Sequence, residues 1–183
     1  ETRFETDEGA VTVIDFMPGN DSHPDLVRLV RGERGTVPMR TELVARFGYG
    51  ATVPWVTRLE DGPLRAVAGP DMMLLRTPVR LHGENLTTRG DFGVTAGETI
   101  PFTLTYGRSF HPLPPSRDPQ QMLAATEKFW RDWIAKCRIG GPWATQVKRS
   151  LMTLKALTFA ETGGIVAAAT TSLPEQIGGA RSW

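Results

Sequence analysis

The segment "GRSFHPLPPSRDP", residues 107–119, separates two parts of the chain whose sequence patterns differ. Pro112, Pro114 and Pro115 exclude a helix here and favour an extended, fairly stiff connector. Short runs of β-branched and aromatic residues between turn signals precede this segment, whereas apolar residues at three- and four-residue spacing follow it. The segment therefore predicts a boundary between a β domain and a helical region.

The part before the connector predicts an antiparallel β-sandwich over residues 1–107. A first strand ends at Phe4, and a turn at Asp7-Glu8-Gly9 leads into a second strand at 11–16, so the two predict a hairpin. Apolar residues alternate with polar ones over 37–47, where we expect a long strand with one buried face. About nine or ten short strands are typical of a sandwich. The others are expected at 26–31, 55–59, 64–68, 72–75, 79–81 and 100–106.

The part after the connector predicts two helices. Asp118 is a suitable N-cap, Pro119 suits the first helical position, and Gln121 follows three residues after the cap. Gly140-Gly141 ends this first helix, and Pro142 begins a second one that runs to about residue 160. The apolar stripe of the first helix comprises Met122, Thr126, Phe129, Trp130, Trp133 and Cys137. The stripe of the second comprises Val147, Leu151, Leu154 and Leu157.

Both apolar stripes need packing partners. Left exposed, Trp130, Trp133 and the leucines of the second helix would promote self-association of the chain. We therefore expect residues 108–141 to be a Pro-rich linker and connecting helix, and residues 142–183 to begin a helical domain.

The charge balance and the single cysteine exclude several kinds of partner. The chain carries 21 basic and 20 acidic residues without runs of one sign, so it lacks the electrostatic footprint of a nucleic-acid or anionic-membrane binder. We expect a neutral substrate or partner. No apolar run approaches the roughly 20 residues that span a bilayer. Cys137 is the only cysteine, which excludes an intrachain disulfide and a cysteine metal cluster and favours the cytoplasm.

The residues show no complete motif for metal binding, cofactor binding or nucleophilic catalysis. His23, His82 and His111 lack a regular metal-ligand spacing, and we interpret them as surface loop residues. No strand-turn-helix elbow surrounds a serine, which argues against a triad built from Ser109 and His111. The glycine pairs lack the lysine of a phosphate loop. We therefore expect no metal and no evident cofactor.

Carboxyl groups are present, but the sequence does not complete a catalytic pair. Glycoside hydrolysis uses two carboxyl groups roughly 5–10 Å apart. We place Asp15 at an outward strand position, Glu161 after a helix end and Glu175 in a loop. Aromatic side chains can also stack on sugars, but helical spacing favours a core role for Phe129, Trp130, Trp133 and Trp143.

The stretch "TLKALTFAETGGIVAAATTSLPEQIGGARSW", residues 153–183, resembles the opening of the catalytic domain in bacterial members of glycoside hydrolase family 15, the glucoamylase and trehalase-like enzymes. "ETRFETDEGAVTVIDFMP" (1–18) and "SHPDLVRLVRG" (22–32) are similar to the N-terminal β-sandwich of that family, and "FWRDWIAKC" (129–137) to its connecting helix. The resemblance covers essentially the whole chain. It departs at Ala168, where we expect proline, and at Ser182, where we expect asparagine.

The resemblance implies a β-sandwich followed by a linker helix and the first helix of a truncated (α/α)6 barrel. It implies an inverting hydrolase acting on an α-linked glucose disaccharide or oligosaccharide, whose acid and base glutamates both lie downstream of Trp183. No catalytic residue is then expected in this chain, and the chain alone is expected to be inactive. The rim of the substrate pocket would include Thr170, Ser172, Glu175 and Trp183. Trehalase-like relatives can depend on phosphate and magnesium, which no residue here indicates.

Two other functions stay open at this point. The chain could be a non-catalytic carbohydrate-binding or assembly module, or an unrelated β-sandwich that binds a ligand and dimerises through its helical tail. Hydrolysis by a longer product of the same reading frame would favour the enzyme over both alternatives.

Overall fold

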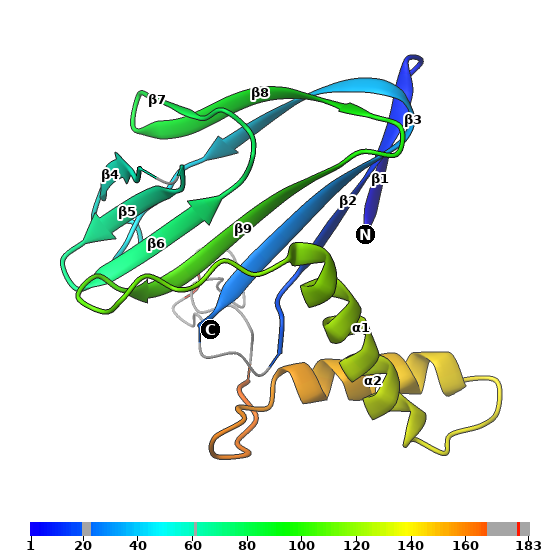
Figure 1. Ribbon diagram of the computed structural model, residues 1–183. Coiled ribbons are helices and arrows are strands. Elements are labelled where there is room, and N and C mark those ends of the chain that lie inside the picture. The colour runs from blue at the N-terminus through cyan, green and yellow to red at the C-terminus, as the bar shows by residue number, and fades with distance from the viewer. Residues whose placement is uncertain (20–22, 61, 168–178, 180–183) are drawn as a thin grey trace. The chain divides into compact units, whose positions relative to one another are not determined.

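The computed structural model describes residues 1–19, 23–60, 62–167 and 179. Its strands all precede its helices in the chain (Figure 1), as the sequence predicts. The strands are β1 (Thr2–Glu5), β2 (Gly9–Phe16), β3 (Asp25–Leu43), β4 (Trp55–Arg58), β5 (Leu64–Ala68), β6 (Asp71–Arg76), β7 (His82–Glu84), β8 (Thr87–Thr95) and β9 (Thr99–Arg108). The helices are α1 (Pro119–Ala135) and α2 (Ala144–Ala156). The predicted order of a β-sandwich followed by helices is confirmed.

The chain divides into two compact units, Glu1–Thr126 and Glu127–Trp183. The first contains every described strand, the connector and the beginning of α1. The second contains the rest of α1, α2 and a turn in which Phe159 N donates to Gly164 O at 2.8 Å and Gly163 N donates to Phe159 O at 2.9 Å. Neither helix in the described ranges is long and apolar enough to cross a membrane.

Strand β3 belongs to two sheets at once, which builds the sandwich. Residues 25–31 of β3 pair with β9 and residues 27–35 pair with β2, whereas its last part, residues 36–43, pairs with β8. The larger sheet has the order β1-β2-β3-β9-β6-β5-β4, and β3, β8 and β7 form the smaller sheet over it (Figure 1). All these pairings are antiparallel.

The sequence predicts two strands, at 26–31 and 37–47, where the structure has the single strand β3. Gly32 and Gly35 lie at the corner where β3 leaves the larger sheet. A Cβ atom on Gly32 would lie 2.0 Å from Thr95 O, and one on Gly35 would lie 1.9 Å from Glu8 O. Gly35 also has a φ of +61°, which favours glycine. The two glycines therefore interrupt the strand pattern of the sequence, although β3 continues through them.

Strands β7 and β8 were not predicted, and the strand predicted at 79–81 is absent. Val79 and Leu81 are buried, but they lie in the segment that crosses over β8. A Cβ atom on Gly90 of β8 would lie 2.7 Å from Leu81 Cδ2 and 3.0 Å from Val79 Cγ1. Gly90 therefore makes room for the crossing, and the same glycine weakens the strand pattern of β8 in the sequence.

The larger sheet has a core on each of its faces. The face toward the smaller sheet carries the cluster Val11, Val30, Val37, Val79, Leu81, Val94 and Phe102. The opposite face carries Ile14, Val27 and Leu29, which pack against Met122 and Leu123 of α1. Because residues on opposite faces of a strand alternate, β2 and β3 are apolar at consecutive positions here and supply both cores.

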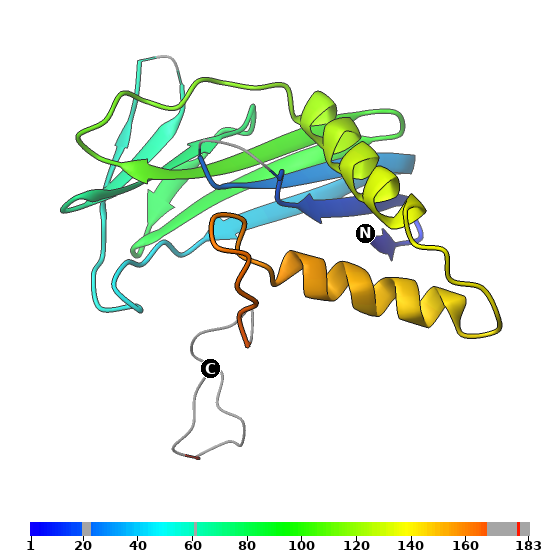
Figure 2. The same ribbon diagram turned by 90° about the horizontal axis from the view of Figure 1, so that it is seen from below.

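The connector after β9 is attached to the larger sheet (Figure 2). Arg76 of β6 donates to Pro114 O, and Arg117 forms an ion pair with the buried Asp25 at the start of β3. Asp118 Oδ1 then accepts a hydrogen bond from Gln120 N at 2.9 Å, which confirms the predicted N-cap of α1. The connector therefore passes directly from the sheet into the helix.

Candidate ligand site and relatives

The rim residues expected from the family resemblance, Thr170, Ser172, Glu175 and Trp183, lie outside the described residues. Their place at a substrate pocket therefore stays a prediction.

Asp15 is exposed, but it does not take the outward position predicted for it, because it shares the face of β2 with Val11 and Val13, which pack toward the smaller sheet. Arg28 of the neighbouring strand donates to Asp15 through Nε at 2.7 Å and through Nη2 at 2.9 Å. This bidentate bond with the Asp15 carboxylate raises the pKa of Arg28. Both side chains are exposed, so the pair is a surface ion pair between β2 and β3 rather than part of a reaction centre.

The three histidines do not converge. His111 is exposed and its ring contacts Phe110 edge-on, with centroids 4.7 Å apart. His82 is exposed in β7 rather than in a loop, and His23 is half-buried before β3, so the surface-loop prediction is confirmed only for His111. Within the described ranges, no group of three or more His, Cys, Asp or Glu residues is arranged to hold a metal ion.

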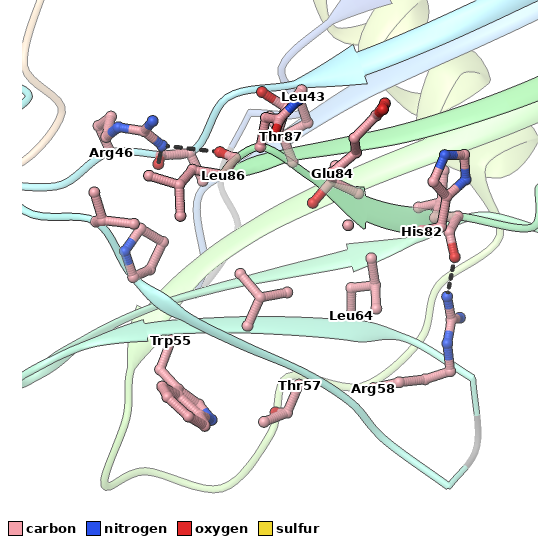
Figure 3. Close-up of a pocket in the computed structure, with 18 residues that line it drawn as sticks. Leu43, Arg46, Trp55, Thr57, Arg58, Leu64, His82, Glu84, Leu86 and Thr87 are labelled. Carbon is pink, nitrogen blue, oxygen red and sulfur yellow. Dashed lines mark hydrogen bonds between the residues drawn. The ribbon is translucent and has the colours of Figure 1, made fainter.

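A pocket of about 610 Å³ opens where the edges of the two sheets diverge, between β4 and the β7–β8 hairpin. We call it the seam pocket (Figure 3). Its floor is apolar and includes Leu43, Val56, Leu64 and Leu81. Arg46 and Arg58 bring guanidinium groups to its edge. His82 and Glu84 contribute to its wall from β7, but their side chains lie on the outward face of the smaller sheet. Its volume lies within the range of roughly 300–1,000 Å³ that is typical of small-molecule sites. An apolar floor with few polar groups is also typical of such sites.

The alternation of β4 decides which of its side chains face the seam pocket. Arg58 is the register partner of Leu64, which packs on the core between the sheets, so Arg58 and Val56 face inward. Trp55 and Thr57 take the alternate positions, and Figure 3 shows both directed away from the pocket. The floor is therefore aliphatic, although an exposed tryptophan stands at its edge.

Two guanidinium groups connect the sides of the seam pocket. Arg58 donates from Nη2 to Leu81 O at 2.7 Å and from Nη1 to Gly62 O at 3.0 Å. Arg46 donates from Nη1 to Leu86 O at 3.3 Å and to Ala45 O at 2.6 Å. Arg58 thereby ties the edge of the larger sheet to the segment that enters β7, and both guanidinium groups are held in place at the rim.

A charged network lies behind the hairpin side of the pocket. Arg89 of β8 lies between Glu84, with which it forms an ion pair, and Glu42 of β3, whose Oε1 is 3.0 Å from Arg89 Nε. Further along the sheet, Arg40 donates to Asp91 at 2.7 Å, which raises the pKa of Arg40 and lowers the pKa of Asp91. The acidic and basic groups of this sheet are thus mostly paired with one another.

The tip of the β7–β8 hairpin has an unusual backbone. Glu84 pairs with Thr87, so the loop consists of Asn85 and Leu86, with φ values of +49° and +59°. Two left-handed residues define a type I′ turn, in which asparagine followed by glycine is the favoured pair. Leucine replaces that glycine here, and its side chain is 68% exposed at the pocket edge.

Sequence reasoning did not find the seam pocket. In the sequence, Arg46 and Arg58 have the pattern of ordinary surface charges. The pocket itself forms from segments that are adjacent only in the folded chain. The one local signal was the Asn85-Leu86 dipeptide between two strand-like runs, where a glycine is the usual second residue.

Several curated proteins named trehalase align with most of this chain. It is 33% identical over 177 residues to a trehalase of Mycobacterium tuberculosis, covering 89% of this chain and 25% of that protein. It is 32% identical to a trehalase of Mycolicibacterium smegmatis, with the same two shares, and 28% identical to a trehalase of Thermoplasma acidophilum, covering 92% of this chain and 30% of that protein. The chain belongs to the trehalase-like glycoside hydrolase family 15.

The family resemblance of the sequence is thereby confirmed. The chain spans about a quarter to a third of the length of the trehalases that it matches. No protein-family model matches it, and no solved structure matches it significantly. The β-rich fold agrees with the N-terminal β-sandwich expected for this trehalase-like family.

Proposed function

We propose that this chain is the N-terminal region of a glycoside hydrolase of the trehalase type, in which the β-sandwich precedes a helical catalytic domain. The alignment with proteins named trehalase, over about nine-tenths of this chain, carries the proposal. The substrate would be an α-linked glucose disaccharide or oligosaccharide, with trehalose first. The near-neutral charge of the chain agrees with an uncharged substrate.

The chemistry of this proposal lies outside the chain. An inverting mechanism needs a general acid and a general base on opposite sides of the scissile bond, and we assign both to glutamates downstream of Trp183. Two aspartates within the described ranges support this placement, because arginines hold their carboxyl groups: Arg28 holds Asp15, and Arg117 holds Asp25. Residues 1–183 alone are then inactive.

The domain scheme follows from the same proposal. Residues 1–107 form the sandwich, residues 108–141 form the linker and connecting helix, and residues 142–183 form the first helix and first active-site loop of an incomplete (α/α)6 domain. In that loop Thr170, Ser172, Glu175 and Trp183 border the substrate pocket. Cytoplasmic residence belongs to the proposal and rests on the single cysteine, Cys137.

Hydrolysis assays on two polypeptides test the proposed function. The full product of the reading frame that encodes this chain and the 183-residue chain itself are each incubated with trehalose, maltose and isomaltose. We expect the full product to release glucose from trehalose and the 183-residue chain to release none. Turnover by the pure 183-residue chain would contradict the downstream placement of the glutamates.

The same assays decide about the alternative function. If the reading frame ends at Trp183, or if its full product hydrolyses none of the three sugars, then a non-catalytic carbohydrate-binding or assembly module is the better description. The added phosphate and magnesium on which related trehalases can depend belong in every assay, so that their omission does not produce a false negative.

A further inference from the structure

The sandwich is closed at one end and open at the other. Near the corner of β3, Val37 and Val94 are 5% and 0% exposed between the two sheets. At the other end the larger sheet finishes at β4 and the smaller sheet at β7, and the seam pocket lies between these two edge strands. Within the described residues, β4 pairs only with β5 and β7 only with β8. Each edge strand therefore leaves one row of backbone N–H and C=O groups without a strand partner.

Large apolar side chains surround this opening. Trp55 and Val56 of β4 are 78% and 45% exposed, and Leu86 at the tip of the β7–β8 hairpin is 68% exposed. Tyr49, on the loop that precedes β4, is 92% exposed. Arg46, in the segment that leads into this loop, donates from Nη1 to Leu86 O at 3.3 Å and so connects the loop to the hairpin. We call these four apolar residues, together with the seam pocket, the open-end surface.

The backbone of the open-end surface is strained where it displays large side chains. Within the described ranges, the non-glycine residues with positive φ are Tyr49, Asn85 and Leu86, and all three lie on the two loops of this end. Glycine would adopt these angles without strain. Because the Tyr49 side chain is almost fully exposed, packing within the described part of the chain does not offset its strain. Such strain is typical of positions where a specific side chain has a function.

The chemistry of the open-end surface favours an apolar protein segment as its partner. The two cations at the rim, Arg46 and Arg58, donate to backbone carbonyl groups of this chain, and two arginines are fewer than the cluster that anionic lipids need. A tryptophan and a tyrosine beside an apolar pocket are typical of the hot spots of protein interfaces. The open edges of β4 and β7 can also pair with an extended backbone.

The lengths of the related trehalases indicate where such a segment is found. The alignment covers about nine-tenths of this chain but only 25% of two of these trehalases and 30% of the third. Most of each relative therefore lies outside the aligned region. We propose that the open-end surface docks the polypeptide that follows Trp183 in the full reading frame, with an apolar side chain of that polypeptide in the seam pocket. This proposal rests on the proposed function, which supplies the longer polypeptide.

Hydroxyl-radical footprinting of two polypeptides tests the docking. The 183-residue chain, at a concentration where it is a monomer, and the full product of the reading frame are oxidised under the same conditions and analysed by mass spectrometry. We expect Tyr49 and Trp55 to react at least about fivefold more slowly in the full product, because a docked partner excludes water from its anchor residues. Phe4 is 51% exposed on β1, at the other edge of the larger sheet, and is the control. Its reactivity should change by less than about twofold.

Three results would overturn the proposal. The first is equal reactivity of Tyr49 and Trp55 in the two polypeptides. The second is protection of both residues already in the monomeric 183-residue chain. The third is protection that appears in the 183-residue chain only as its concentration rises, which identifies a second copy of the chain as the occupant.

Substitutions separate docking from folding. Because Trp55 is 78% exposed, Trp55→Glu should shift the midpoint of thermal unfolding of the 183-residue chain by less than about 2 °C. In the full product the new charge should expose the surface, so that Tyr49 regains the reactivity that it has in the 183-residue chain. Phe4→Glu is the matched control and should leave Tyr49 protected in the full product. Continued protection of Tyr49 in the Trp55→Glu full product would contradict the docking.

Tyr49→Gly tests the role of the strained tyrosine. It should not lower the midpoint of thermal unfolding of the 183-residue chain, because relief of the left-handed conformation offsets the added freedom of glycine in the unfolded chain. It should lower the midpoint of the full product, which loses an anchor residue. An equal decrease in both polypeptides would show that Tyr49 acts within its own loop and would contradict its role in docking.

The outcomes also separate this proposal from the proposed function. If the full product hydrolyses trehalose while Tyr49 and Trp55 stay reactive, the docking fails and the proposed function stands. If both residues are protected in a full product that hydrolyses none of the three sugars, the proposed function fails and the docking stands. A reading frame that ends at Trp183 overturns both.

Discussion

Arg117 in the connector forms an ion pair with Asp25 at the start of β3, 92 positions earlier in the chain. Asp25 is 4% exposed; its Oδ2 accepts from Arg117, and its Oδ1 has no hydrogen-bond partner within the described residues. The pair therefore ties the segment that leads into α1 to the strand that joins both sheets. Because the Asp25 carboxylate is buried, its negative charge is stabilised by the Arg117 guanidinium that faces it.

Replacing only Arg117 should destabilise the chain. Arg117→Met leaves the buried Asp25 carboxylate without its cation and should lower the free energy of unfolding by about 3 kcal/mol. The double variant Asp25→Leu with Arg117→Met should recover most of this loss, since an apolar pair can replace a buried ion pair at little cost. Urea denaturation of the three proteins measures both values. Arg28→Met, which removes the exposed pair with Asp15, is the control and should cost less than about 1 kcal/mol.

Gly35 should tolerate no side chain. Gly35→Ala would place Cβ at 1.9 Å from Glu8 O and in a left-handed backbone, so the corner of β3 must open. We expect a loss of about 4 kcal/mol in the free energy of unfolding, or failure to fold. Gly93→Ala is the matched control in the sheet, because its Cβ would meet only Thr36 Cγ2 at 3.8 Å. Similar losses for the two variants would contradict the role of the corner.

The Tyr106 hydroxyl should lose its proton at a higher pH than an ordinary tyrosine. It donates to the Asp71 carboxylate, and this bond raises the pKa of Tyr106 above its ordinary value of 10.0, although the nearby Arg108 acts in the opposite direction. Asp71→Asn should bring the pKa back toward that value. Absorbance at alkaline pH measures it, with Tyr49→Phe as background so that Tyr106 is the only tyrosine.

The same bond predicts a pH dependence of stability. The pKa of Tyr106 is higher in the folded than in the unfolded chain. The contribution of its hydrogen bond to the free energy of unfolding is therefore complete below pH 10 and is lost as the pH rises through the folded-state pKa. The Asp71→Asn variant should show a smaller loss over this alkaline window. An identical alkaline decline in both proteins would rule out this contribution.

Self-association of the 183-residue chain should depend on the apolar surface of its second unit. Trp143, Leu154 and Phe159 are 69%, 49% and 51% exposed. Because such surfaces associate in water, sedimentation at increasing concentration should reveal oligomers, and Leu154→Glu should weaken the association by about tenfold. Thr145→Glu on the same helix is the control for added charge and should have little effect. A monomer at all concentrations would contradict the prediction.

Local patterns in the sequence were sufficient for the helices and for most strands. Asp118 and Pro119 mark the start of α1 because capping is an interaction between neighbouring residues. The hairpin of β1 and β2 was predicted for the same reason, since its turn lies within a few residues. Strand β8 was missed because glycines interrupt its strand pattern, and one of them, Gly90, makes room for Val79 and Leu81 of a distant segment.

The sequence by itself determined the succession of strands, proline-rich connector and helices, and it contained the similarity that places the chain among trehalase-like glycoside hydrolases. These features depend on the local conformational preferences of residues and on residue identity along an alignment. Only the tertiary structure decided that β3 serves two sheets and that Arg58 reaches Leu81 O across the seam pocket. Such relationships arise from pairing between segments far apart in the chain, and no local preference encodes which segments meet.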